Sequence, residues 1–258
     1  MTSPSLPTAR VLDRYQASVA GRLLAGAGAA VLVAYRHDPN VAHQVLAHGL
    51  TDAGELVVAV SQDVVTAEGC EIRLDIVREA AEPRLRITAA TAHLLGQLTV
   101  LPVTLFEARG VPEAIAELAG VPGIAVGVVR CDRVLLHHGP GVVRLRFADV
   151  AVAAFPSHDD ELEVQGVVAG FATEELLQIA AAVGAGRLDG AVLSQRPTIP
   201  MAVRDEEQMY CVDVDSQGLT LMRVAEVTTV TFIAFPEPVG DAMDVFLALI
   251  GLVMRARS

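Results

Sequence analysis

The chain contains no tryptophan, and aromatic residues make up only 4% of its 258 residues. Hydrophobic residues nevertheless account for 52% of the chain, mostly as alanine, valine and leucine, so we expect aliphatic cores. This is enough apolar material to bury a sizeable core. The length allows one large domain or two modest ones.

Cysteine is scarce, with only Cys70, Cys131 and Cys211 in the whole chain. The three are odd in number, far apart in sequence and never spaced as C-x-x-C. This pattern excludes a disulfide framework and a cysteine-based zinc site. It favours free thiols in a reducing compartment, buried or half-buried as free cysteines usually are.

The sequence also has no long apolar run and no excess of positive charge. Its first apolar run, residues 23–34, is interrupted by Gly26 and Gly28 and is shorter than the roughly 20 residues that a membrane span needs. Residues 1–10 lack the apolar core of a signal peptide, so we expect a cytoplasmic protein. The net charge of −12 argues against nucleic acid or an anionic membrane surface as the main partner.

No self-sufficient catalytic motif is present. The sequence has no phosphate-binding loop, no G-x-G-x-x-G after a strand, no G-x-S-x-G and no H-E-x-x-H. Function therefore has to be inferred from the overall pattern of elements and from individual histidines and arginines.

The first 156 residues predict many short strands and few helices. Apolar positions recur at helical spacing over residues 10–25, and Pro112 opens a short helix over residues 111–119. The remainder contains about seven short strands separated by Gly and Pro turns, which favours a barrel or a sandwich. One strand is expected over residues 43–50, and two strand-like stretches flank Gly96.

The pattern of short strands ends near residue 156, and an acidic, polar stretch follows over residues 157–163. We therefore place a domain boundary there, giving domains 1–156 and 157–258. A helix is expected over 173–183, a loop-rich stretch over 185–200, and a hairpin around residues 215–218. Asp241 starts a last helix. Its predicted apolar face consists of Val245, Phe246, Leu249, Ile250, Leu252 and Val253.

Seven histidines are candidate ligands, because neutral imidazole binds iron and other metals. They are His37, His43, His48, His93, His137, His138 and His158. His43 and His48 are five residues apart, an odd offset that places them on opposite faces of a regular strand. His93 lies among small and apolar residues, where it either serves as a ligand or is a satisfied core histidine.

Four arginines cluster in the middle of the expected barrel: Arg73, Arg78, Arg84 and Arg86. Such donors suit a ligand that carries carboxylates or phosphates. Acidic residues are interleaved with them, so ion pairing on a solvated face is the competing explanation.

Three C-terminal segments, residues 212–221, 230–239 and 252–257, resemble the C-terminal domain of haem-utilisation proteins of the HugZ type. In those proteins a D-x-x-G-x-x-L hairpin, here beginning at Asp215, leads to a strand that ends in F-P-x-P-V, here beginning at Phe235, and then to a closing helix. The N-terminal part is compatible with the split barrel of that family. The resemblance covers most of the chain in layout and is specific in motifs only over about residues 212–257.

The resemblance implies an α+β fold, in which an FMN-binding-like split β-barrel is followed by a smaller α+β domain, and a homodimer that holds haem near its interface. Some members degrade haem, and others bind it or act as regulators without catalysis. The family's C-terminal histidines are missing here, since none follows His158. A ligand to iron must therefore come from the barrel.

We accordingly predict a haem-binding protein with His93 as the first candidate for the metal ligand, followed by His43 and His48. Arg84 and Arg86 are the candidates for binding the propionates. Two alternatives stay open on the same barrel. One is an oxidoreductase that uses FMN or a deazaflavin, and the other is a non-enzymatic regulator.

Overall fold

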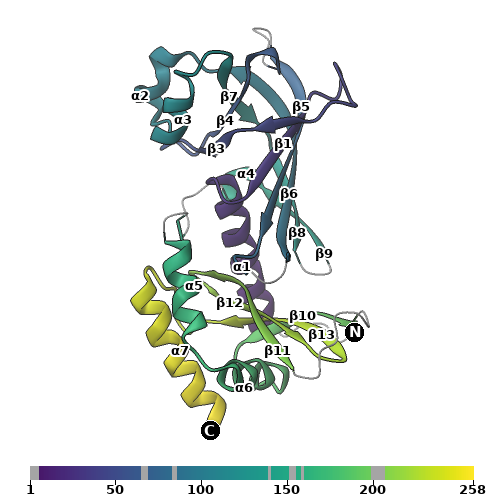
Figure 1. The fold of residues 1–258 in the computed structure, drawn as a ribbon, viewed down its shortest axis with the longest axis vertical. Coiled ribbons are helices and arrows are strands. Elements are labelled where there is room, and N and C mark those ends of the chain that lie inside the picture. The colour runs from purple at the N-terminus through teal and green to yellow at the C-terminus, as the bar shows by residue number, and fades with distance from the viewer. Residues whose placement is uncertain are drawn as a thin grey trace.

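In a computed structural model of the chain, the described residues are 6–64, 69–82, 86–138, 141–150, 155–157, 160–198 and 207–258. They form a nearly closed antiparallel barrel and, below it in Figure 1, a smaller unit with its own sheet and helices. The helix α1 (Leu6–Leu24) runs from one into the other. The predicted α+β class and the predicted leading helix are both confirmed.

The barrel sheet has the strand order β2-β1-β5-β6-β7-β4-β3, and β8 pairs with both β6 and β9. The strands are β1 (Ala29–Val33), β2 (His43–Val45), β3 (Ala47–Leu50), β4 (Leu56–Ser61), β5 (Cys70–Glu79), β6 (Thr88–Val100), β7 (Ile124–Arg130), β8 (Arg133–His138) and β9 (Gly141–Arg146). Its two ends, β2 and β3, are joined by the single residue Leu46, so the chain itself draws the sheet into a barrel. The strand predicted over 43–50 is therefore two strands, and His43 and His48 lie on different ones.

Gly96 lies inside one continuous strand, whereas the sequence pattern predicted a break there. A Cβ atom at this position would lie 2.4 Å from the backbone oxygen of Arg130. Glycine is therefore needed so that β6 can pass close to the end of β7. This long strand pairs with β8 along its first half and with β7 along its second half.

Short helices close the barrel at one end. They are α2 (Phe106–Arg109) and α3 (Glu113–Leu118), with single 3-10 turns at Gln62–Val64 and Val103–Leu105. Phe106 and Ile115 anchor these helices on buried valines of β4 and β7. The helix α4 (Phe147–Val150) follows β9.

The smaller unit has the strand order β10-β13-β12-β11. Its strands are β10 (Gly190–Pro197), β11 (Gln208–Asp215), β12 (Gly218–Val224) and β13 (Val227–Ala234), and its helices are α5 (Glu161–Ala169), α6 (Thr173–Gly184) and α7 (Ala242–Arg257). The loop predicted over 185–200 is wrong, because β10 forms there by pairing with β13. Because the partner strand lies 30 or more residues away in sequence, residues 185–200 by themselves do not show the pattern of a strand.

The two units share α1. Tyr15 on this helix is fully buried and stacks on Phe232 of β13, with ring centroids 3.9 Å apart. Phe232 and Ala234 belong to the same apolar cluster as the barrel interior. The domain boundary after residue 156 stays a prediction.

Among the described helices, none is by itself long and apolar enough to cross a membrane; α5 and α6 pass that test only as a pair, and they are bent by 96° at the break between them.

Candidate functional site

The outer surface of β5, β6, β8 and β9 carries the residue that the sequence singled out, His93. Side chains alternate across these strands, so that Leu74, Ala92 and Leu136 point inward and are buried. The strand registers set the outward residues side by side. We call this surface the His93 face; it comprises Arg73, Asp75, Val77, Thr91, His93, Leu95, Arg133, Leu135, His137, Val142, Arg144 and Arg146.

His93 is oriented by a carboxylate from the neighbouring strand. Its Nδ1 atom lies 2.6 Å from Oδ1 of Asp75, which is directly opposite it in the register of β5 and β6. A carboxylate can only accept, so Nδ1–H donates, and in the neutral imidazole Nε2 then carries the lone pair. The His93 side chain is 37% exposed, and Nε2 has no hydrogen bond within the described residues. This is the carboxylate–histidine arrangement that orients metal ligands in proteins.

A second imidazole lies beside the first. His137 on β8 is exposed, and its ring meets the His93 ring edge to face at a centroid distance of 4.8 Å. Apolar side chains flank the pair, since Leu95 is 63% exposed and Val142 is 58% exposed. The His93 face thus combines a carboxylate-oriented histidine with exposed apolar side chains.

Arginines surround this patch although the protein is strongly acidic. Arg144 lies opposite Leu135, which lies opposite His93, and Arg133 lies opposite Arg146. In the described part of the chain, neither Arg133 nor Arg144 has an acidic partner, whereas Arg73 pairs with Asp75. Free guanidinium groups of this kind bind carboxylates and phosphates through paired hydrogen bonds.

A cleft of about 400 Å³ adjoins the face at Leu95. Its lining includes Gly96, Arg130, Cys131 and Phe147. Burial, with the nearby Asp132, raises the pKa of the Cys131 thiol to about 12, so this thiol is protonated at neutral pH and is a poor nucleophile. The charged side chains that line the cleft are Glu55, Arg130 and Asp132, so the cleft offers polar contacts rather than a reactive thiol.

The other predicted site residues are scattered. His43 lies on β2 opposite Leu32, away from the His93 face. His48 is buried, and its Nε2 atom is 2.8 Å from the backbone oxygen of Leu23. Arg86 is exposed and pairs with Glu79, and Arg84 lies outside the described residues. Among the predicted site residues that the structure describes, only His93 faces the apolar and basic surface described above.

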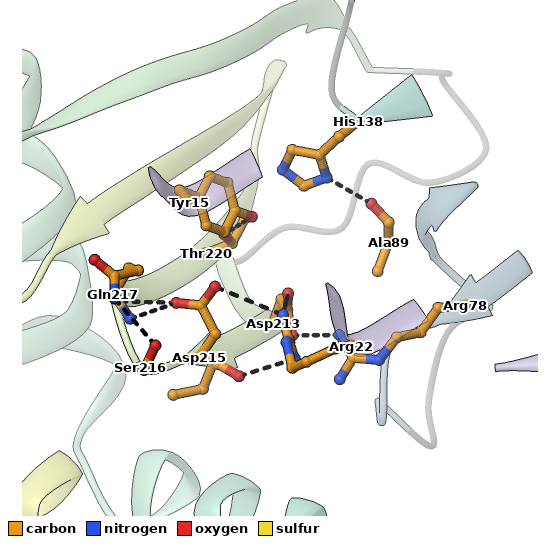
Figure 2. A network of polar contacts seen from close by, with 12 residues as sticks. Tyr15, Arg22, Arg78, Ala89, His138, Asp213, Asp215, Ser216, Gln217 and Thr220 are labelled. Carbon is orange, nitrogen blue, oxygen red and sulfur yellow. Dashed lines mark hydrogen bonds and ion pairs between the residues drawn. The ribbon is translucent and has the colours of Figure 1, made fainter. Parts of the chain in front are cut away.

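A second polar constellation, which sequence reasoning missed, is buried between the two units (Figure 2). Arg22 of α1 donates from Nη2 to Oδ2 of Asp213 at 2.5 Å and from Nη1 to Oδ1 at 3.0 Å. Arg78 of β5 donates to the same carboxylate at 2.5 Å and also pairs with Glu161 of α5. The available signal was Arg22 inside an apolar helical run, together with the D-x-D spacing of Asp213 and Asp215.

The charges in this network keep Asp213 ionised. Burial alone would raise its pKa, but the adjacent guanidinium groups of Arg22 and Arg78 hold the pKa of Asp213 well below its usual range. Nearby, the Tyr15 hydroxyl lies 2.5 Å from Oγ1 of Thr220, and Nδ1 of His138 lies 3.0 Å from the Ala89 oxygen. We interpret the network as a structural joint between α1, β5 and β11.

Asp215, two residues further, behaves in the opposite way. Burial raises the pKa of Asp215 to about 6. The charge of Arg22 lowers this pKa and the charge of Asp213 raises it, but burial is the largest effect. Its Oδ1 atom accepts hydrogen bonds from the backbone N–H groups of Gln217 and Gly218. A pKa that is higher in the folded state means that this group's contribution to stability is lost as the pH rises from about 4 through 6.

Asp215→Asn keeps an oxygen acceptor and removes the titration. Between pH 4.5 and pH 7.5 the wild type should lose about 2 kcal/mol of unfolding free energy relative to the variant. The reason is that the wild-type carboxyl group becomes ionised over this range in a buried site that disfavours the charge. Urea unfolding followed by circular dichroism at both pH values measures it. A difference between the two proteins that does not change with pH would contradict the expectation.

Comparison with known proteins supports the fold. No protein-family profile and no curated protein sequence matches the chain. A solved structure of a haem-binding protein from Mycobacterium smegmatis is similar over 100% of this chain and 99% of its own, with a TM-score of 0.55 and 18% identity. A protein of unknown function from Agrobacterium tumefaciens str. C58 matches over 98% of both chains, with 17% identity and a TM-score of 0.38.

Proposed function

We propose that the protein binds haem on the His93 face, where Nε2 of His93 would bind the iron. The observation that carries this proposal is the 2.6 Å contact between His93 and Asp75, which leaves Nε2 available on an exposed face. The similar fold of the Mycobacterium smegmatis haem-binding protein supports it. Haem would supply a redox-active iron. The residues of this chain would orient the His93 imidazole and contact the edge of the haem.

The remainder of the face fits an amphipathic macrocycle. Leu95 lies two residues from His93 on the same side of β6, about 7 Å away along the strand, and provides apolar contact. Arg144 is two strands away from His93, about 10 Å between Cα atoms, and Arg133 is near it. These arginines replace Arg84 and Arg86 as our candidates for the propionates.

Absorption spectroscopy tests the proposal directly. Titration of the purified apoprotein with hemin should give a Soret band that differs from that of free hemin and saturates at one haem per chain. A yellow chromophore that copurifies and is released on denaturation would favour the flavin or deazaflavin alternative instead. The absence of both would favour the regulator.

The resemblance to haem-utilisation proteins also raises oxidative haem degradation, and the same sample tests it. Adding ascorbate and oxygen to the complex should bleach the Soret band and release iron if the protein degrades haem. A stable spectrum under these conditions would indicate that the protein binds haem without degrading it. The location in the cytoplasm stays a prediction from the sequence.

We further propose a homodimer that forms through this face, so that haem would lie at the interface, as the resemblance to haem-utilisation proteins implies. Val77, Leu95 and Val142 are exposed here, and exposed apolar patches usually mark interfaces. Leu95→Asp is expected to lower the mass measured by light scattering at micromolar concentration from twice 27.1 kDa towards 27.1 kDa. A wild-type protein that is already monomeric would contradict the prediction.

A further inference from the structure

The C-terminal helix α7 is apolar on two sides. One side is buried in the smaller unit through Val245, Leu249, Leu252, Val253 and Ala256. The sequence pattern also placed Phe246 and Ile250 on that side, but they are 41% and 37% exposed. Together with Met243, Leu247 and Met254, which are 63%, 58% and 67% exposed, they form a second line of side chains, the α7 stripe.

The α7 stripe runs along the whole helix. Its members follow one another at intervals of three, one, three and four residues, so they lie on one face. Figure 1 shows α7 at the outer edge of the smaller unit. Phe171 extends the stripe beside Phe246, with ring centroids 6.0 Å apart. A surface helix normally turns charged and polar residues outward, so this outward apolar line indicates a partner.

The charges beside the stripe indicate which partner. Asp244 lies in the first turn of α7 and Arg255 in the last. They are eleven residues apart, about three turns, and therefore lie on the same flank of the stripe. Neither forms an ion pair within the described residues; Asp244 accepts a backbone hydrogen bond from Gly240, and Arg255 donates to the Gly251 oxygen. The flank thus carries one free charge of each sign, at opposite ends.

We infer that the α7 stripe packs against the α7 stripe of a second copy of this chain, with the helices antiparallel. In that arrangement Met243 of one copy meets Met254 of the other, and Leu247 meets Ile250 around the two-fold axis. Asp244 of each copy then lies beside Arg255 of the other, and the helix dipoles oppose each other. A parallel two-fold arrangement would instead place the two Asp244 side chains on opposite sides of the interface, and likewise the two Arg255 side chains, so that Asp244 and Arg255 would not meet.

This interface is separate from the His93 face, which is on the barrel. A chain with two self-complementary faces associates beyond a dimer, so the wild type is expected to form assemblies larger than a dimer at higher concentration. The test uses the Leu95→Asp background, in which association through the barrel is removed, at concentrations above the micromolar range in which this variant is expected to be monomeric. Any remaining association is then assigned to α7. An absence of this association would be distinguishable from an absence of haem binding, because the two are measured separately.

Charge exchange tests the antiparallel pairing. In the Leu95→Asp background, Asp244→Arg and Arg255→Asp should each raise the dissociation constant, measured by sedimentation velocity, more than ~10-fold, because like charges then face each other. An equimolar mixture of the two variants should associate again, since the introduced arginine of one variant then faces the introduced aspartate of the other. Leu247→Asp should abolish association, and Glu107→Arg, an exposed charge reversal on α2, should change nothing.

Two outcomes would overturn the inference. One is a mixture of the charge variants that stays as monomeric as its components although circular dichroism shows that both are folded. The other is sedimentation of the Leu95→Asp protein with phosphatidylcholine vesicles, abolished by Leu247→Asp, without self-association in solution. That result would assign the α7 stripe to a lipid surface.

Discussion

His93→Ala should abolish the Soret band of the bound complex or lower the affinity for hemin by on the order of 100-fold or more, while the protein stays folded. The imidazole is the proposed bond to iron, and changes even to residues that only support a metal ligand typically weaken binding 10- to 100-fold. Because the side chain is 37% exposed and packs in no core, we expect the unfolding free energy to change by less than about 1 kcal/mol.

Three other variants make this result specific. Asp75→Asn should weaken hemin binding about 10-fold, because the amide supports the Nδ1–H donor less strongly than the carboxylate does. His37→Ala, on an exposed turn, should bind as the wild type does. His48→Ala should leave the spectrum unchanged and lower stability, since His48 is buried against the Leu23 oxygen. If His93→Ala bound hemin with unchanged spectrum and affinity, the proposed ligand would be wrong.

Asp213→Ala should lower the free energy of unfolding by about 3–5 kcal/mol at pH 7. The substitution leaves Arg22 and Arg78 buried and removes the carboxylate that both contact. Arg78 keeps Glu161, but Arg22 keeps only the Val214 oxygen and, at 3.8 Å, Asp215. The uncompensated charge on Arg22 is therefore the main source of the loss.

The pH dependence of this loss follows from the pKa of Asp213, which is lowered in the folded protein. Stabilisation by a group with a lowered pKa is present above the unfolded-state value of about 4 and is lost only as the pH falls towards the folded-state value. The difference between wild type and Asp213→Ala should therefore persist from pH 8 down to about pH 4. Urea unfolding followed by circular dichroism measures it.

A surface carboxylate provides the control. Asp149 faces Arg146 at 4.0 Å, and both side chains are more than half exposed, so Asp149→Ala should change stability by less than about 0.5 kcal/mol. Replacing Arg22 with Met in the Asp213→Ala protein should recover part of the loss, because α1 then buries no unpaired charge near position 213. An Asp213→Ala protein as stable as the Asp149→Ala control would show that the network contributes nothing.

Local patterns in the sequence were sufficient for several elements. The alternation of Ile72, Leu74 and Ile76 predicted a strand with one buried face, and all three are fully buried on β5. Asp241 predicted the start of the last helix, where its Oδ1 atom accepts the Asp244 N–H at 2.8 Å. Such signals depend on side-chain period and on hydrogen bonds between near neighbours, both of which are written in a few consecutive residues.

Non-local contacts explain the errors. Residues 190–197 form a strand because β13 pairs with them, and Gly96 continues a strand because the Arg130 backbone passes close to it. The exposure of Phe246 and Ile250 depends on which side of α7 the smaller unit covers. The identity of an apolar residue indicates that it can be buried, but whether it is buried depends on which residues pack against it in the fold.

The candidate site divides in the same way. The surroundings of His93 in the sequence made it the first candidate ligand, and its role as a ligand stays a prediction, as does the absence of a nucleic-acid partner. The sequence alone could not place Asp75 against Nδ1 or His137 beside the ring, because both contacts arise from the register of separate strands. It likewise could not join Arg22 to Asp213, 191 residues away, because a buried charge finds its partner only when the two units pack.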